Sequence, residues 1–270
     1  MSKDANYPLS VGEKFVGRLM RLNAFSQPCS SEFLRRSGLK QGDHIIDVGC
    51  GIGEFTCWLA EHVGSKGRVV AIDISEEQVD IAKQAAKSKN LNNIEFHVMS
   101  IYDLAQLNQE FDLVYSRYVV DHIAEQMRAI QVMSAVTRKG GIVCCESSAW
   151  HTLTAFSYPN VQAHETLHRW FDSLRRLTVY SSELGFRLPA MFRQTGLQNI
   201  SIDLVQPTLK TYYHREHELL LLDECRQAFI EQGIASQSDI DAVHQKLAAA
   251  IANEKIEFFW FLVAQVSAKK

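Results

Sequence analysis

The sequence predicts an α/β fold in which a doubly wound sheet carries helices on both faces. Between residues 43 and 147, short apolar segments alternate with amphipathic ones in the order β-α-β-α-β-x-β-α-β. Such alternation implies parallel strands with right-handed crossovers. A turn with three glycines, Gly49, Gly51 and Gly53, follows the first strand, and an acid, Asp73, ends the second. We therefore expect a ligand at the carboxyl ends of the strands.

Length, charge and cysteine content restrict which partners and which compartment the protein can have. The chain has 270 residues and a net charge of −3, so no basic surplus exists to neutralise a nucleic acid. No apolar run is long enough to span a bilayer, and residues 1–8 lack the apolar core of a signal peptide. None of the six cysteines forms a C-x-x-C pair, which favours a reduced, cytoplasmic protein. Both a monomer and a homodimer are compatible with this composition.

Two helices are expected before the sheet, and residues 1–42 would form an N-terminal helical cap. In the first, at residues 11–24, the apolar side chains recur at helical spacing. The second, at residues 30–37, ends at Gly38, a residue type typical of helix C-caps. The apolar face of the first helix comprises Val11, Phe15, Leu19, Leu22 and Phe25.

The glycine turn indicates what kind of ligand binds. Its spacing is G-x-G-x-G, whereas a dinucleotide fingerprint is G-x-G-x-x-G. Glu54 follows immediately, and its carboxylate would repel a pyrophosphate. A ligand without phosphate fits better, which weakens the alternative of a nicotinamide-dependent reductase. Asp73 stands about 20 residues after the glycines, the spacing at which an acid reaches ribose hydroxyls.

The rest of the core, residues 43–148, follows in order. Ser75 is expected to cap the helix after the second strand. Further strands are expected at 94–99, 111–116 and 142–146, with a helix at 124–138 and a turn at Gly140-Gly141. The strand ends place one set of residues on a common rim: Asp47, Asp73, Ser100, Ser116, Arg117 and Glu146.

After Ser148 the regular alternation stops. Residues 149–183 are expected to form lid helices, broken at Pro159-Asn160. Residues 184–270 would complete the core, with a helical insertion at about 210–254. The expected elements there are a helix at 184–195 interrupted near Pro189, a strand at 199–206, helices at 215–232 and 238–253, and a closing strand at 256–266. Ser236-x-x-Asp239 and Ser238-x-x-Asp241 are alternative caps for the last helix.

Four stretches, in this order, resemble the motifs of class I S-adenosylmethionine-dependent methyltransferases. They are Asp47-Val-Gly-Cys-Gly-Ile-Gly53, the strand-ending Asp73, Phe111-Asp-Leu-Val-Tyr-Ser116 and Gly140-Gly-Ile-Val-Cys-Cys-Glu146. The match covers about the central half of the chain and is most similar to the UbiE-like small-molecule group. The resemblance implies a Rossmann-like methyltransferase fold with seven mostly parallel strands, the last antiparallel. It also implies methyl transfer from S-adenosylmethionine to an O, N or C atom of a small-molecule acceptor.

The resemblance also implies roles for the rim. The glycine turn would hold the methionine part of the cofactor, Asp73 both ribose hydroxyls, and Ile74 the adenine face. The family often has Asp where Ser100 stands, so the contact to the adenine amino group would differ here. Arg117 would line the methionine end. The full set of expected cofactor-binding residues is Asp47, Gly49, Cys50, Gly51, Gly53, Asp73, Ile74, Gln78, Ser100, Ile101, Ser116 and Arg117.

Candidates for the acceptor side are fewer. His122 lies on the rim after the fourth strand, where it would orient an acceptor or act as a base near neutral pH. In the alternative interpretation, His122 is a residue at the start of a helix that pairs with Asp121 or with the backbone. Glu146 would bind a cationic or hydroxyl acceptor, or else be a solvated strand end. The expected acceptor contacts, each of which is alternatively a packing residue, are Tyr7, Tyr118, Glu146, Trp150 and His151.

One motif competes with this interpretation. His164-Glu-Thr-Leu-His168 matches H-E-x-x-H, which places two histidines on one helix face. A zinc hydrolase needs a third ligand, and the extended metzincin pattern fails because Phe171 stands where its glycine belongs. We expect a lid helix whose histidines face the acceptor or solvent, with no metal. The alternatives are a metal-dependent hydrolase that uses His164 and His168, and a non-catalytic S-adenosylmethionine-binding protein.

Overall fold

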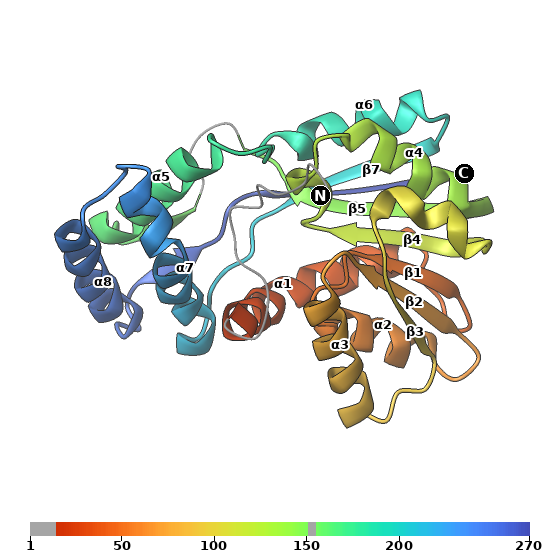
Figure 1. Cartoon of the computed structure of the whole chain (residues 1–270), viewed down its shortest axis with the longest axis horizontal. Coiled ribbons are helices and arrows are strands. Elements are labelled where there is room, and N and C mark those ends of the chain that lie inside the picture. The colour runs from red at the N-terminus through yellow and green to blue at the C-terminus, as the bar shows by residue number, and fades with distance from the viewer. Residues whose placement is uncertain (1–14, 151–154) are drawn as a thin grey trace.

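The computed structural model describes residues 15–150 and 155–270, and a seven-stranded sheet lies at its centre (Figure 1). The strand order is β3-β2-β1-β4-β5-β9-β7. β9 pairs antiparallel with both β5 and β7, whereas the strands from β3 to β5 pair in parallel. The predicted doubly wound sheet with an antiparallel last strand is confirmed. The strands are β1 His44–Val48, β2 Arg68–Asp73, β3 Ile94–Val98, β4 Phe111–Arg117, β5 Thr137–Ser148, β7 Gln198–Val205 and β9 Val263–Lys269.

Helices cover both faces of this sheet. One face carries α1 (Val16–Ser37), α2 (Glu54–Val63) and α3 (Glu76–Ser88), and the other carries α4 (Gln126–Val136) and α6 (Leu184–Gln194) (Figure 1). Two 3-10 turns, η2 (Ile101–Leu107) and η3 (Val120–His122), follow β3 and β4 on the side where the strands end. Chain segments after β1, β2, β3 and β4 therefore meet at one edge.

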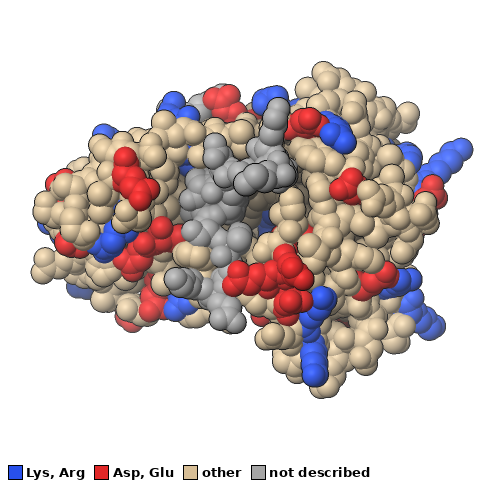
Figure 2. All heavy atoms as spheres, in the orientation of Figure 1, with Lys and Arg blue, Asp and Glu red and all other residues tan. Residues whose placement is uncertain are grey.

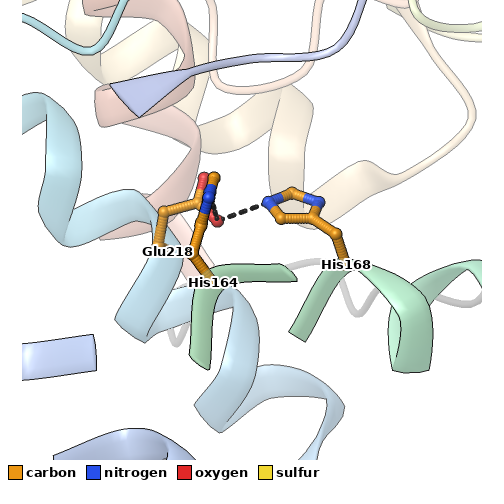
Figure 3. A group of neighbouring side chains, drawn as sticks. All are labelled: His164, His168 and Glu218. Atoms are coloured by element: carbon orange, nitrogen blue, oxygen red, sulfur yellow. Dashed lines mark hydrogen bonds and ion pairs between the residues drawn. The ribbon is translucent and has the colours of Figure 1, made fainter. Parts of the chain in front are cut away.

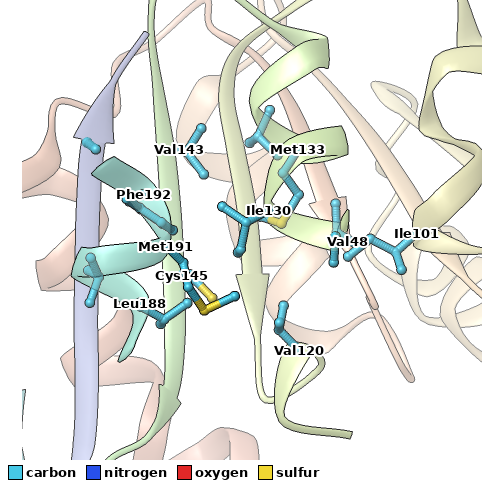
Figure 4. Close-up of a cluster of buried hydrophobic side chains, with 14 of the residues drawn as sticks. Val48, Ile101, Val120, Ile130, Met133, Val143, Cys145, Leu188, Met191 and Phe192 are labelled. Carbon is cyan, nitrogen blue, oxygen red and sulfur yellow. The ribbon is translucent and has the colours of Figure 1, made fainter. Parts of the chain in front are cut away.

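The core between the sheet and the second helix layer is closely packed. Val143 and Cys145 of β5 meet Ile130 and Met133 of α4 and Phe192 of α6, and all are buried (Figure 4). Because helices cover both faces, the central strands are apolar on both sides rather than alternating. This packing makes the strand ends a rigid platform for the residues that follow them.

A second lobe lies beside the sheet (Figure 1). Its own hydrophobic core includes Leu222, Phe229, Leu247 and Phe258. It is built from β6 (Phe156–Tyr158), α5 (Gln162–Arg175), α7 (Tyr212–Glu231), α8 (Gln237–Ile251) and β8 (Glu257–Phe259), with β6 and β8 paired antiparallel.

Helix α1 joins the lobe to the sheet. It packs on α2 and β5 on one side and on α7 on the other. Arg18 forms a buried ion pair with Glu224, and Arg21 Nη2 lies 2.7 Å from Glu216 Oε2. The charges at this helix contact are therefore paired across the two units.

Three local predictions were wrong. The two helices expected at 11–24 and 30–37 are one helix, α1, over its described part, and Pro28 lies inside it. Similarly α6 continues through Pro189. A proline removes one backbone N–H and crowds the preceding turn, but packing on both sides of the helix outweighs that cost.

The third error concerns strands. The closing strand expected at 256–266 is two strands in different sheets, β8 and β9, separated where the amide of Trp260 bonds the carbonyl of Pro207. The short strand β6 replaces part of the expected helical lid. Helix caps were better predicted: Ser75 accepts a bond from the amide of Gln78, and Ser236 forms a capping box with Asp239.

The surface carries mixed charges. On the face in Figure 2, Lys and Arg side chains of the described residues are interspersed with Asp and Glu. Within residues 15–150 and 155–270, no helix is both long and apolar enough to cross a membrane.

Candidate active site

A cavity of about 560 Å³ opens at the carboxyl ends of β1, β2 and β4. Its wall contains residues that follow each of these strands together with the inner side of α1. Of the residues expected from sequence, the wall includes Asp47, Gly49, Cys50, Gly51, Asp73, Ile74, Gln78, Ser100, Ile101, Arg117, Tyr118 and His122.

The glycine turn is fixed by the end of β2. The amides of Gly49 and Cys50 both donate to the carbonyl of Ile72, at 2.8 and 2.9 Å. Gly49 has a φ of +79°, and a Cβ there would lie 2.1 Å from Val119. Only glycine satisfies both the positive φ and the close approach. At these glycines the cavity is therefore lined by main-chain atoms with no side chain in front of them.

Gly53 has a different role from the one expected. It is not among the described residues of the cavity wall, and a Cβ there would lie 2.8 Å from the Cα of Ala82. The residue lets α2 start against α3, which is the packing role of a third glycine in nucleotide turns. Gly53 supports the site indirectly.

Asp47 ends β1 beneath the turn. Its Oδ2 accepts a hydrogen bond of 2.6 Å from Thr56 Oγ1 on α2. Burial raises the pKa of Asp47 to about 6, while the Thr56 bond and the charge of Arg117 oppose the rise. The group therefore holds the turn to α2 and supplies negative charge at the cavity floor at neutral pH.

Asp73 ends β2, on the same rim of the sheet as Asp47. Its Oδ2 accepts from the amide of Gly51 and its Oδ1 from the amide of Ser75, both at 3.0 Å. A carboxylate has about four acceptor positions, so both oxygens keep capacity for hydroxyl donors. Ile74 beside it is 59% exposed although large and apolar, and it lies on the cavity wall. A diol and a flat apolar ring are the groups that this pair can bind.

Arg117 ends β4 and connects the rim to α1. Its Nη2 donates to Asn23 Oδ1 at 2.8 Å and its Nη1 to Ser30 Oγ at 3.1 Å. The guanidinium carbon lies 4.5 Å from the centre of the Phe55 ring. Arg117 is thus held in one orientation by two helices.

Helix α1 supplies a wall that sequence reasoning missed. Leu19, Leu22 and Asn23 line the cavity opposite the glycine turn. The helical spacing placed both leucines on an apolar face, but spacing does not distinguish a face that meets a cavity from one that meets the core. Val119 and Ile123 extend the same apolar wall from the β4 side.

His122 lies on the wall and is buried. Burial, with the charges of Arg175 and Arg18, lowers its pKa to about 3. The imidazole is therefore neutral across the physiological range and a weak base, so the expectation of a base that titrates near neutral pH is wrong. Its ring lies 4.8 Å from that of Tyr180. A neutral, fixed imidazole suits hydrogen bonding to an acceptor.

Three expected residues lie off the described wall. Glu146 is neither a solvated strand end nor a cavity residue: it is 2% exposed and accepts from Tyr115 Oη at 2.5 Å and Gln265 Nε2 at 2.9 Å. Trp150 is buried under Arg175, whose guanidinium carbon lies 4.1 Å from its ring. Ser116 is buried within β4. Tyr7 and His151 are outside the described residues.

The H-E-x-x-H histidines face neither acceptor nor solvent. His164 and His168 are 1% and 3% exposed, inside the second lobe. Glu218 of α7, which the sequence did not single out, lies between them (Figure 3). Glu165 points outward and pairs with Arg169. A hydrolase would need substrate access and the motif's own carboxylate, Glu165, at these histidines, but the histidines are buried and Glu165 is paired with Arg169.

A family model described as a methyltransferase domain matches residues 39–196. The chain belongs to the class I S-adenosylmethionine-dependent methyltransferases, in the UbiE-like group. Its similarity to a demethylmenaquinone methyltransferase of Bacillus cereus is 30% identity, over 63% of this chain and 76% of that protein. An uncharacterized methyltransferase of Schizosaccharomyces pombe is 33% identical, over 52% of this chain and 51% of its own. This methyltransferase chain thus spans about half the length of the first relatives it matches.

Solved structures show the same fold for this methyltransferase. YcgJ of Bacillus subtilis superimposes with a TM-score of 0.59 at 16% identity, over 89% of this chain and 97% of that one. Phosphoethanolamine N-methyltransferase 2 of Haemonchus contortus, solved with S-adenosyl-L-methionine, gives 0.54 at 17% identity, over 88% of this chain and 51% of that one. At such identities the likeness is one of fold.

Proposed function

We propose that this protein transfers a methyl group from S-adenosylmethionine to a small, largely apolar molecule that carries a hydroxyl group. The observation that carries the proposal is the single cavity that joins the Asp73 rim to the apolar wall of α1. One end offers a carboxylate, an exposed Ile74 and glycine backbone, and the other offers Leu19 and Leu22. We place the cofactor at the first end and the methyl acceptor at the second, so that the two molecules touch inside the cavity.

The residues present fit this cofactor. S-adenosylmethionine has a ribose diol, an adenine, an ammonium, a carboxylate and a sulfonium, and no phosphate. Asp73 keeps acceptor capacity for the diol, and Ile74 offers an apolar face to the adenine. Asp47 and Glu54 provide negative charge beside the turn, which suits a cation and repels a phosphate. Gln78, Ser100, Ile101 and Arg117 complete the wall on which we place the cofactor.

When bound, the cofactor supplies a methyl carbon attached to a good leaving group. The acceptor atom would bond to that carbon as the carbon–sulfur bond breaks, the electron pair would remain on sulfur, and the acceptor would lose its proton to solvent because His122 is a weak base. The protein must mainly hold the acceptor atom in line. We assign this positioning to His122 and Tyr118 on the β4 side and to Asn23 on α1.

The acceptor class follows from the lining. Leu19, Leu22, Val119 and Ile123 are apolar, and they enclose the neutral His122. Such a wall favours an uncharged aromatic ring over a charged amine. Relatives named demethylmenaquinone methyltransferases are consistent with a hydroxylated aromatic acceptor of the quinol type.

The compartment and assembly belong to the same proposal. All six cysteines are free thiols in the structure, and four of them are buried. Free thiols persist in a reducing compartment, so we place the protein in the cytoplasm. The cavity wall is built from one chain, which is compatible with a monomer or a homodimer.

Two measurements test the proposal. Isothermal titration with S-adenosylmethionine should give one binding site, and absence of heat at millimolar cofactor would refute the cofactor. Transfer of tritiated methyl to a short-chain naphthoquinol should then exceed the rate without enzyme. Cofactor binding without transfer to any hydroxylated aromatic acceptor would refute the acceptor class while leaving the cofactor site intact.

A further inference from the structure

Three side chains outside the cavity converge inside the second lobe. His164 and His168, one helical turn apart on α5, both direct their Nε2 atoms at Oε2 of Glu218 on α7 (Figure 3). The nitrogen–oxygen distances are 3.4 and 2.7 Å, and one donor atom from each residue lies within 4.8 Å of the others. The three residues are 1%, 3% and 0% exposed.

The partners of this carboxylate are histidines rather than lysine or arginine. Within residues 15–150 and 155–270, the ion pairs of Glu218 are all to histidines: His164, His168 and His217. The nearby arginine of α1, Arg18, is paired with Glu224. A buried carboxylate without a full positive charge beside it is costly in an apolar lobe.

Hydrogen bonding is also incomplete in the same place. Glu218 Oε1 has a distant polar neighbour, His217 Nδ1 at 3.5 Å, and His164 Nδ1 is buried without a hydrogen-bond partner among the described residues. Phe258 and Trp260 wall the cluster, with ring centres 4.9 Å from His164 and 5.8 Å from His168. The geometry concentrates donor atoms in an apolar shell, and a cation would complete their bonding.

The donor set is that of a transition-metal site, and the two donor separations to Glu218 are close to the spacing such a site needs. Bonds of about 2.0–2.1 Å in tetrahedral geometry put donors about 3.3 Å apart. The His164 separation already has this value, and His168 needs to retreat by only a fraction of an ångström. The cluster offers two imidazole nitrogens and one carboxylate, and it has no thiolate. Zinc and other divalent first-row transition metals bind such ligands.

We propose that His164, His168 and Glu218 bind one divalent transition-metal ion of the zinc class, through Nε2, Nε2 and Oε2. The ion joins α5 to α7, and through α7 it supports α1, which lines the cavity. Glu165, the general base of hydrolytic H-E-x-x-H sites, pairs with Arg169 on the outer side. Three protein ligands leave one tetrahedral position for a water, but the cluster is buried and Glu165 does not face it, so we assign the ion a structural role.

Metal binding to the unaltered full-length protein is the first test. Protein dialysed against a chelator, given Zn²⁺ and desalted should retain about one equivalent by elemental analysis. Excess Zn²⁺ should raise the melting temperature by about 5 °C relative to the chelated protein, and Mg²⁺ should not. Co²⁺ should give the intense visible absorption of a tetrahedral site. Retention of less than about 0.2 equivalents of zinc would overturn the proposal, and the cluster would then be a hydrogen-bonded one only.

Matched variants locate the ion. Glu218→Gln and His168→Ala should each lose the retained zinc and the cobalt absorption. Glu165→Gln, a change in the same motif on the outer face, should retain both. Circular dichroism confirms that each variant is folded. Zinc retained at the unaltered level by both folded ligand variants would place the ion elsewhere and overturn the assignment.

Discussion

At the scale of single residues, Asp73 is the side chain on which the cofactor proposal depends most. Asp73→Asn removes the charge and replaces one acceptor oxygen with a donor, so one of the two amides, Gly51 or Ser75, loses its acceptor and the ribose hydroxyls lose acceptor capacity. A hydrogen bond to a charged group contributes about 1.5–3 kcal/mol, so the Kd for S-adenosylmethionine should rise by about 10–100-fold. Isothermal titration measures it. An unchanged Kd would show that Asp73 does not contact the ribose.

Asp121, next to His122 but off the described cavity wall, should make stability depend on pH. Its Oδ1 accepts from Ser147 and Ser148, whereas Oδ2 is buried without a hydrogen-bond partner among described residues. Burial raises its pKa to about 7. The unfolded group ionises near pH 3.9, so folding loses stability as pH rises from about 4 and the loss is complete above about 7.

Asp121→Asn should remove this dependence. The amide keeps an acceptor for Ser147 and Ser148 and carries no charge. The variant should be more stable than the unaltered protein by about 4 kcal/mol at pH 8, with the difference shrinking toward pH 5. Urea unfolding at both pH values measures it. A difference that grew toward low pH would contradict the raised pKa.

Residues at strand ends could be predicted because chain order alone brings them to one rim. Asp73, Gly49 and Arg117 reach the cavity for that reason. Gly53 and Glu146 could not be assigned this way. Whether a glycine faces ligand or a neighbouring helix depends on α3, and the burial of Glu146 depends on Tyr115 and Gln265. Such contacts are set by packing that no short motif records.

At the scale of elements, the contact of α1 with α7 holds the cavity wall in place. The Arg18–Glu224 pair is buried, with side chains 4% and 2% exposed. Removal of one partner leaves an uncompensated buried charge, so Arg18→Met and Glu224→Gln should each destabilise by about 3 kcal/mol. The double variant should cost clearly less than the sum of the two. Urea unfolding of the four proteins gives the coupling.

A surface pair provides the control for that cycle. Arg128 and Glu125 are also an ion pair, but both are more than half exposed. The same cycle on Arg128→Met and Glu125→Gln should give coupling below about 0.5 kcal/mol. Equal coupling in the two cycles would mean that burial does not strengthen the α1–α7 contact.

Helices and strands could be predicted where one hydrophobic pattern ran through the whole element. They could not be predicted where tertiary packing outweighed a local feature of the sequence. The parallel strands of the core were predicted because both faces are apolar, but β5 begins at Thr137 and contains the expected turn at Gly140-Gly141. The sequence suggested two helices, at 11–24 and 30–37, but the sheet on one side and α7 on the other hold α1 continuous over its described part. The run at 256–266 is mostly aromatic and β-branched and contains no glycine or proline, so no turn residue marks where β8 ends and β9 begins.

At the scale of the whole molecule, the sheet and the lobe have separate hydrophobic cores joined through α1. The cavity lies where the sheet meets α1, whereas α8 packs on α5 and α7 on the far side of the lobe (Figure 1). A ligand in the cavity should therefore stabilise the two units unequally. The free energy of local unfolding differs from one part of a protein to another, and amide hydrogen exchange measures it.

Hydrogen exchange with and without S-adenosylhomocysteine should reveal this gradient. Amides of residues 47–54 and 73–78 should exchange at least about tenfold more slowly with ligand, because they form the cavity rim. Residues 18–25 of α1 should be protected to a smaller degree, since Leu19, Leu22 and Asn23 reach the same cavity from one side. Residues 240–250 of α8 should not change. Protection of α8 equal to that of the rim would mean that ligand binding orders the whole molecule as one unit, and no protection of α1 would remove that helix from the ligand site.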